Sequence, residues 1–144
     1  MYRVVFIIAL LLVCKAFRDQ SVAVKGRFLC GKAPAAKVMV TLIDAYPDKQ
    51  MKQNAILSKG YTDARGNFMF SGAVAKISAL GPALKVYHDC NDVTKFGVAK
   101  PGSREVTFVI PDHYIGAGKT PKKIMDVGSI NLELKFKNEE RELK

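Results

Sequence analysis

The sequence predicts an all-β domain in which two sheets pack face to face as a sandwich. Apolar and polar residues alternate along several short segments, turn residues separate these segments, and no heptad or helical repeat is present. Each alternating segment has one apolar face, which must be buried against a second sheet. We therefore expect about seven to eight strands, with one short helix near residues 91–96.

The predicted strands follow one another along the chain. Their apolar faces carry Val22, Val24, Phe28 and Cys30; Ala36, Val38, Val40 and Leu42; Phe68 and Phe70; Leu84, Val86, His88 and Cys90; Val106, Phe108 and Ile110; and Ile130, Leu132, Leu134 and Phe136. Gly- and Pro-containing turns separate these segments. In one turn we expect Asp63 to accept hydrogen bonds from backbone amides and Gly66 to adopt a positive φ.

Residues 1–16 have the features of a secretory signal peptide. Arg3 supplies a positive start, an apolar run covers residues 4–14, and Ala16 is a small residue suited to cleavage. The run is shorter than the roughly 17–25 residues of a membrane-spanning helix, so we expect no transmembrane segment. The sequence therefore predicts a protein secreted to the extracellular space.

Cleavage would define the mature protein. We expect it after Ala16, with a site near Ser21 or Ala23 as the alternative, which leaves residues 17–144 as one sandwich domain. That domain is basic, with a formal net charge of +8, because residues 1–16 hold two basic residues and no acidic one. A basic surface favours anionic partners such as acidic lipids, acidic proteins or sulfated glycans.

Two cysteines remain in this domain, Cys30 and Cys90, and both fall on apolar faces of predicted strands. An even number of cysteines suits an oxidising extracellular compartment. A disulfide between them would lie inside the sandwich or at its edge. Closing a loop of about 60 residues would contribute roughly 4 kcal/mol in the chain-entropy model. Two buried free thiols are the alternative, because free cysteine is itself commonly buried.

Five ordered segments cover almost all of the predicted mature chain and carry the motifs of one family. They read VKGRFLC at 24–30, TDARGNF at 62–68, LKVYHDC at 84–90, IPDHYI at 110–115 and DVGSINL at 126–132. Together they resemble the transthyretin-like family of secreted proteins, best known from nematodes. The resemblance implies a prealbumin-like, or transthyretin-like, β-sandwich with an extracellular, non-enzymatic role.

The resemblance also bears on the cysteines. Members of the family commonly carry two further cysteines, which would fall here near Gly102 and Leu143. Both are absent, as though one whole bridge had been lost. The family pattern therefore implies that Cys30 and Cys90 are bonded to each other.

We expect no catalytic site, no metal site and no cofactor. His88 alternates with core residues, which predicts a hydrogen-bonded structural histidine, and His113 is expected in a loop. Asp89 falls on the opposite face from His88 and Cys90, and no zinc-type spacing is present. A related sandwich family hydrolyses 5-hydroxyisourate with a C-terminal Tyr-Arg-Gly-Ser motif, which residues 140–144 lack.

Lysines cluster in two predicted loops. Lys119, Lys122 and Lys123 precede the last predicted strand, and Lys49 and Lys52 lie in a loop that is often acidic in members of the family. Each lysine near an anionic membrane contributes on the order of 1 kcal/mol. We predict a binding or adaptor protein that docks through these loops on anionic cell-surface lipid or on a receptor.

Two alternatives stay open. The protein could carry a small hydrophobic ligand, as vertebrate transthyretin does in a channel formed by an oligomer. Its basic surface could also serve solubility alone. Nucleic acid is not an expected partner, because the protein is predicted to be secreted and no aromatic ladder accompanies the lysines. The salt dependence of binding distinguishes docking from carriage. Salt screens the attraction between surface charges and an anionic partner, but it does not weaken the binding of an apolar ligand in a pocket.

Overall fold

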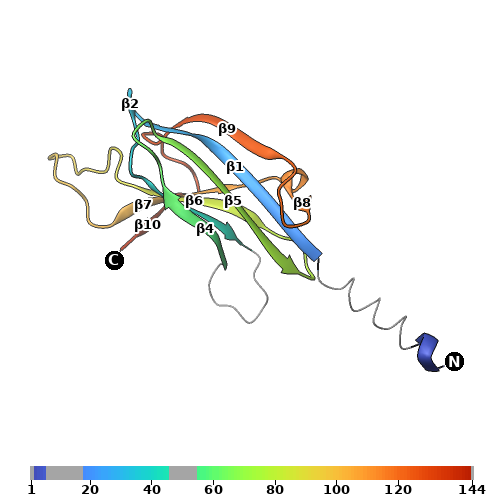
Figure 1. Cartoon of the computed structure of the whole chain (residues 1–144). Helices are drawn as coiled ribbons and strands as arrows, with labels where there is room; N and C mark the ends of the chain where they lie inside the picture. Colours follow the sequence, from blue (N-terminus) through green and yellow to red (C-terminus); the bar gives the residue numbers. More distant parts are fainter. Residues whose placement is uncertain (1, 6–17, 46–54, 144) are drawn as a thin grey trace.

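The computed structural model describes residues 2–5, 18–45 and 55–143, and it confirms the all-β prediction. Two sheets form a sandwich (Figure 1). The first contains β1 (Arg18–Cys30), β2 (Ala33–Pro34), β5 (Asn67–Lys76), β8 (Gly116–Ala117) and β9 (Ile124–Asn131). The second contains β3 (Met39–Asp44), β4 (Ala55–Tyr61), β6 (Pro82–His88), β7 (Ser103–Val109) and β10 (Glu140–Glu142). This part of the chain has ten strands, more than predicted, because β2, β8 and β10 are only two or three residues long.

β1 is the central strand of the first sheet. It pairs with β5 in antiparallel register from Arg18 to Arg27, and with β9 in parallel register from Ala23 to Leu29. The second sheet has the order β10-β7-β6-β3-β4, with every pair antiparallel. Along one side of the sandwich β4 contacts β5, whereas β7 and β9 on the other side approach each other less closely. The sandwich is therefore more open between β7 and β9.

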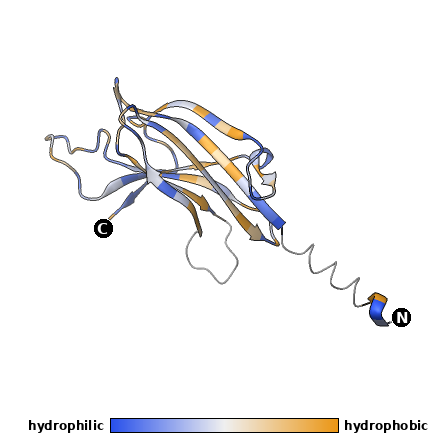
Figure 2. Cartoon of the chain, viewed as in Figure 1, coloured by the Kyte–Doolittle hydropathy of each residue, from blue (hydrophilic) through white to orange (hydrophobic). Residues whose placement is uncertain are grey.

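The core lies between the sheets, on the faces that the alternation predicts. Val24 and Phe28 of β1 and Leu84 and Val86 of β6 are each at most 1% exposed. The ring of Phe28 stacks on Phe68, with ring centroids 4.5 Å apart. Burying a side chain of this size contributes about 1.5–3 kcal/mol. Figure 2 shows the same pattern, in which apolar and polar residues alternate along the strands.

The turn between β4 and β5 forms as predicted. The carboxylate of Asp63 accepts hydrogen bonds from the amides of Arg65 and Asn67, at 2.9 and 2.8 Å. Gly66 has a φ of 80°, a conformation that disfavours any residue with a Cβ. Phe68 then enters the core directly after the turn, so this short segment fixes where β5 begins.

Two predicted strands have different bounds. The segment from Ala36 becomes a strand only at Met39, because Lys37 adopts a positive φ of 56° in a turn. The last predicted strand, 130–136, ends at Asn131. There the Asn131 side chain accepts a hydrogen bond from the Glu133 amide, which turns the chain away. Leu134, predicted as a core residue, is 61% exposed as a result.

The predicted helix near 91–96 is wrong. Residues 91–100 form a narrow loop in which Val93 and Ala99 make an isolated bridge. The Thr94 hydroxyl accepts hydrogen bonds from the amides at 96 and 98, which stabilises a turn in place of a helix. Within residues 18–45 and 55–143 the one short helix lies elsewhere, as the 3₁₀ turn η1 (Asp112–Tyr114).

The sandwich has two ends. We call the end at which β1 begins, at Arg18, the β1-start end, and the end at which β1 finishes, at Cys30, the disulfide end. At the β1-start end, the Gly118 amide donates to the Asp19 carbonyl, and the Leu80 amide donates to the Gln20 side chain. At the other end, the disulfide end, β1 finishes at Cys30. β1 has 13 residues, so the two ends are about 40 Å apart. In Figure 1 the 91–100 loop, in yellow, projects from the disulfide end, and β8 lies at the β1-start end.

Candidate functional site

The two cysteines of the predicted mature domain form a disulfide. Cys30 ends β1 in the first sheet, and Cys90 follows β6 in the second, with their Cα atoms 5.7 Å apart. The bridge therefore joins the two sheets across one end of the sandwich. Both side chains pack against the hydrophobic core, as their positions on apolar faces predicted.

Three of the five predicted lysines lie together and are exposed. Lys119, Lys122 and Lys123 all belong to the loop between β8 and β9, and none of them forms an ion pair within the described ranges. We call residues 118–123 the lysine loop. Lys49 and Lys52 lie outside the described residues.

The lysine loop is braced against the start of β1. β8 pairs with Gln20 and Ser21 immediately before the loop, and β9 pairs with Ala23 immediately after it. The backbone nitrogen of Lys122 packs closely over Gly116, where a Cβ would lie 3.5 Å from it. The loop therefore presents its lysines from a fixed place at the β1-start end.

The strands around the second lysine-bearing segment end at the same place. Asp44 is the last residue of β3, Ala55 is the first of β4, and the two pair with each other. Asp44 also pairs with Pro82, next to Leu80, which is held by Gln20 of β1. The flanks of the segment that contains Lys49 and Lys52 are thus at the β1-start end, together with the lysine loop.

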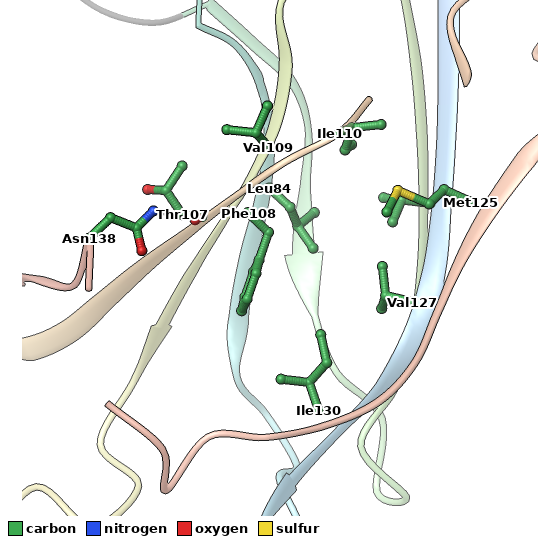
Figure 3. A pocket seen from close by; sticks show the side chains of 10 residues that line it. Leu84, Thr107, Phe108, Val109, Ile110, Met125, Val127, Ile130 and Asn138 are labelled. Atoms are coloured by element: carbon green, nitrogen blue, oxygen red, sulfur yellow. Dashed lines mark hydrogen bonds between the residues drawn. The ribbon is translucent and has the colours of Figure 1, made fainter. Parts of the chain in front are cut away.

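An apolar groove opens between the two sheets on the side where β7 and β9 face each other (Figure 3). Its volume is about 390 Å³. Side chains of β1, β6, β7 and β9 line it, chiefly Val24, Leu84, Phe108, Ile110, Met125, Val127 and Ile130. Two polar residues, Thr107 and Asn138, lie at one margin, and the Asn138 side-chain amide donates to the Thr107 carbonyl at 2.7 Å.

The groove exists because its walls are incompletely covered. Phe108, Met125, Val127 and Ile130 pack on the core but remain partly exposed. β10 pairs with β7 only from Ser103 to Glu105, and beyond it the Thr107 carbonyl accepts from the Asn138 side chain, so no described strand pairs with the later part of this edge of β7. The sequence analysis expected Phe108 and Ile130 in the core and did not predict this space.

Comparison with known proteins identifies the chain. The model of the transthyretin-like family matches residues 25–111, which contain both cysteines and six of the strands described above, β2 to β7. The chain belongs to the transthyretin-like family. Transthyretin-like protein 46 of Caenorhabditis elegans is 48% identical over 141 residues, covering 96% of this chain and 74% of that protein. Transthyretin-like protein 33 of the same organism is 34% identical over 146 residues, covering 99% and 97%.

Among solved structures, a 9R-lipoxygenase from Cyanothece PCC8801 has a TM-score of 0.39 and 16% identity, covering 78% of this chain and 16% of that one. This similarity is too weak to support an argument about the fold. The transthyretin-like sandwich is supported by the family match and by the two sheets.

A buried arginine organises the disulfide end of this transthyretin-like protein. Arg104 is 4% exposed, and its guanidinium donates to the carbonyls of Cys90, Leu132 and Leu134 at 2.6, 3.0 and 2.9 Å. It also pairs with Glu139, and its hydrogen bonds to this carboxylate hold the pKa of Glu139 below its usual range. The sequence analysis did not single out Arg104, because carbonyl partners 14 to 30 residues away leave no local pattern.

The two histidines of this family member have different surroundings. The Nδ1 of His88 accepts a hydrogen bond from the Cys90 amide at 3.0 Å, which confirms the prediction of a structural histidine. Burial, together with the charge of Arg104, lowers the pKa of His88 to about 4. His113 is exposed on η1, beside the ring of Tyr114.

The residues that could ligate a metal are dispersed in the transthyretin-like domain. As predicted from alternation, Asp89 is exposed, whereas His88 and Cys90 are buried. Within residues 2–5, 18–45 and 55–143, no three His, Cys, Asp or Glu side chains come together as a metal site. The helices in the same ranges include none that is long and apolar enough to span a bilayer.

Proposed function

We propose that this protein is a secreted, non-enzymatic binding or adaptor protein that docks on anionic cell-surface lipid through its lysine loop. One observation supports this most strongly. Lys119, Lys122 and Lys123 are exposed together on a loop that β8, β9 and the start of β1 hold in place. A braced loop loses less conformational freedom on binding than a flexible tail does.

The charge is sufficient for measurable binding. Three lysines at about 1 kcal/mol each give about 3 kcal/mol, or a factor of roughly 100 in affinity. Lys49 and Lys52 belong to a segment whose flanks reach the same end, and they would add to this attraction. Asp44, which is buried at this end, is paired with Lys76 at 2.6 Å.

Secretion is part of the proposal. The Cys30–Cys90 bridge suits an oxidising compartment. β1 begins at Arg18, two residues after the predicted cleavage site at Ala16, so cleavage there would leave the whole strand in the mature protein. Cleavage near Ser21 or Ala23 would instead remove residues that pair with β5.

A non-enzymatic role fits the surroundings of both histidines. His88 is 4% exposed, and its Nδ1 is already occupied by the Cys90 amide, so it is not placed to reach a substrate. His113 lies on the exposed turn η1, where its closest ring neighbour is Tyr114. Neither histidine is hydrogen-bonded to a serine or cysteine nucleophile among the described residues.

Co-sedimentation with vesicles tests the docking proposal. The protein would be mixed with neutral phosphatidylcholine vesicles, or with vesicles that also contain phosphatidylserine, at about 0.15 M salt. We expect binding to the anionic vesicles only, weakened as salt is raised. Replacing Lys119, Lys122 and Lys123 with Gln should lower the affinity about 100-fold.

A matched variant controls for net charge. Lys95, Lys100 and Lys135 are exposed near the disulfide end, and replacing all three with Gln changes the net charge equally. This control should retain most of the vesicle binding. Equal affinity of the lysine-loop variant and the unmodified protein would refute the assignment. Loss of binding in the control alone would move the docking surface to the disulfide end.

Carriage of a small hydrophobic ligand is the second candidate, and the apolar groove favours it. A volume of about 390 Å³ is within the usual range for small-molecule sites, which are mostly apolar. The groove lies within one chain, so this role would not require the oligomer that the sequence-based alternative assumed. Binding of a neutral apolar probe that is unaffected by salt would support carriage; the absence of such binding would remove it.

A further inference from the structure

We infer that the groove and the lysine loop form one site, which binds an anionic amphiphile with a single apolar chain. The chain of the ligand would lie in the groove, and its anionic end would meet Lys122 and Lys123. This inference rests on the proposed affinity of the lysine loop for anions and adds an apolar site of its own. A fatty acid and a lysophospholipid share the required chemistry.

The groove has the shape of an elongated apolar site. It runs beside β9 from Met125 to Ile130, five residue steps or about 16 Å of extended strand (Figure 3). Val24, Leu84 and Ile110, each at most 2% exposed, border it on the core side. No charged side chain lines it, and the Asn138 side-chain amide already donates to the Thr107 backbone carbonyl. The lining therefore suits a hydrocarbon chain.

The anionic end must lie beyond one end of the groove. Met125 and Ile110 line the groove toward the β1-start end (Figure 3), and the lysine loop leads directly into β9 there. Lys123 precedes Met125 by two positions, the spacing of side chains that share a face in extended backbone. Asp112 follows Ile110 at the same end, and Asp126 lies between Met125 and Val127, where it is exposed and accepts a hydrogen bond from the Gly128 amide. The three lysines outnumber these two acidic residues.

A second copy of this chain is the competing occupant. The free edges of β7 and β9 could pair with those of another molecule, as edge strands do. The basic net charge of each copy opposes such a pairing. The apolar lining and the neighbouring positive charge are both matched by an anionic amphiphile, and we therefore favour it.

A chain-length series tests the apolar part on the unmodified protein. Calorimetric titration would compare carboxylates of 8, 10, 12, 14 and 16 carbons, below their micelle-forming concentrations. Affinity should rise about three- to fourfold for each CH₂ that enters the groove and then level off. Affinity that is independent of chain length would overturn the inference.

Two variants test whether the hydrocarbon chain of the ligand lies in the groove. Met125→Trp fills the groove and should weaken dodecanoate binding at least tenfold. Met69→Trp is the matched control, because Met69 is 60% exposed on β5 and does not line the groove. Near-ultraviolet circular dichroism would check that both variants fold. Equal dodecanoate affinity in the two variants would exclude the groove.

The role of the lysines is tested by changing the polar end group of the ligand from a carboxylate to a hydroxyl. Replacing Lys122 and Lys123 with Gln should weaken dodecanoate binding about tenfold and leave binding of 1-dodecanol unchanged. Equal effects on both ligands would contradict the proposed orientation. Dodecanoate and a lysophosphatidylglycerol of the same chain length then distinguish the two sources of ligand by their relative affinities.

These results separate the inference from the proposed function. If no amphiphile binds while anionic vesicles still bind in a salt-sensitive way, the inference fails and the docking proposal stands. If dodecanoate binds while vesicles do not, membrane docking fails and the groove site stands. A dimer that Met125→Trp disrupts, found together with no amphiphile binding, would assign the groove to a second copy and overturn the inference.

Discussion

His88 lies on the inner face of β6, where its imidazole is buried and its Nδ1 is bonded to the Cys90 amide. Burial and the nearby Arg104 make the charged form unfavourable, so its pKa falls to about 4. Glu139 and Asp92 act in the opposite direction, but more weakly. A neutral buried histidine of this kind makes stability depend on pH, because the unfolded chain binds a proton more readily than the folded one does.

We predict that the free energy of unfolding falls by up to about 3 kcal/mol as the pH is lowered from 6.5 to 4. In that window the unfolded histidine is protonated and the folded one is not. Urea unfolding at a series of pH values measures the effect. In His88→Asn, whose side-chain oxygen can still accept from the Cys90 amide, the decline above pH 4.5 should be absent. An unchanged decline in this variant would assign it to other groups.

The carboxylates of Asp92 and Glu139 affect stability at lower pH than His88 does. Arg141 lowers the pKa of Asp92, and Arg104 lowers that of Glu139. Each therefore stabilises the fold above its unfolded pKa and loses that contribution as pH falls below it. Their effect lies below about pH 4.5, so it does not obscure the histidine window.

The buried ion pair of Lys76 and Asp44 links the two sheets near the β1-start end. The Lys76 ammonium lies 2.6 Å from one oxygen of Asp44, and the Gly81 amide donates to the other oxygen at 3.0 Å. We predict that Lys76→Met lowers the free energy of unfolding by about 3–5 kcal/mol, because it removes the ammonium from a buried carboxylate. Chemical denaturation measures this.

The more exposed pair of Lys85 and Glu105 supplies the comparison. Lys85→Met should change the free energy of unfolding by about 1 kcal/mol or less, because solvent screens a partly exposed pair. If the two Lys→Met variants were destabilised equally, burial would not be what makes the Lys76–Asp44 pair important.

At the scale of elements, β1 is the strand on which the first sheet depends. It pairs with β5 along one edge and with β8 and β9 along the other. Ser21 and Val22 are completely buried, so both faces of this part of the strand are covered. Any processing that shortens β1 would therefore remove pairing and burial at once.

We predict that the full chain expressed in insect cells is secreted as residues 17–144. Intact-mass analysis of the protein in the medium measures the mature start directly. Cleavage near Ser21 or Ala23 would remove up to six residues of β1, so a product that begins there should be unfolded or retained in the cell. A folded, secreted product with that start would contradict this reading of β1.

The C-terminal segment contains one of the two positions at which the family resemblance led us to expect a further cysteine. β10 pairs with β7 so that Glu142 faces Ser103, and the next position of this register brings Leu143 opposite Gly102. These are the positions where the family resemblance places two further cysteines. In this chain the salt bridges Arg104–Glu139 and Arg141–Asp92 hold the segment instead.

For the whole molecule, strand alternation predicted the fold because it has a period of two and depends on local sequence. It placed Val24, Leu84 and Val106 correctly in the core. It placed Leu132 in the core correctly but failed at Leu134, in the segment whose backbone carbonyls Arg104 binds from a distant strand. It could not predict the groove, because the partial exposure of Phe108 and Met125 depends on how far apart the two sheets lie on that side.

The same openness predicts uneven stability across the molecule. β1 and β6 are paired on both edges, whereas β9 has one paired edge and borders the groove. Amides in β1 and β6 should therefore exchange with solvent at least about 100-fold more slowly than those of β9, since opening of an edge strand exposes less buried surface than global unfolding. Hydrogen exchange with mass spectrometry measures this, and uniform exchange would show that the open side is no weaker than the closed one. Added dodecanoate should slow exchange in β9 and in the later part of β7 while leaving β4 and β5 unchanged, because the groove lies on the side of the sandwich opposite to them.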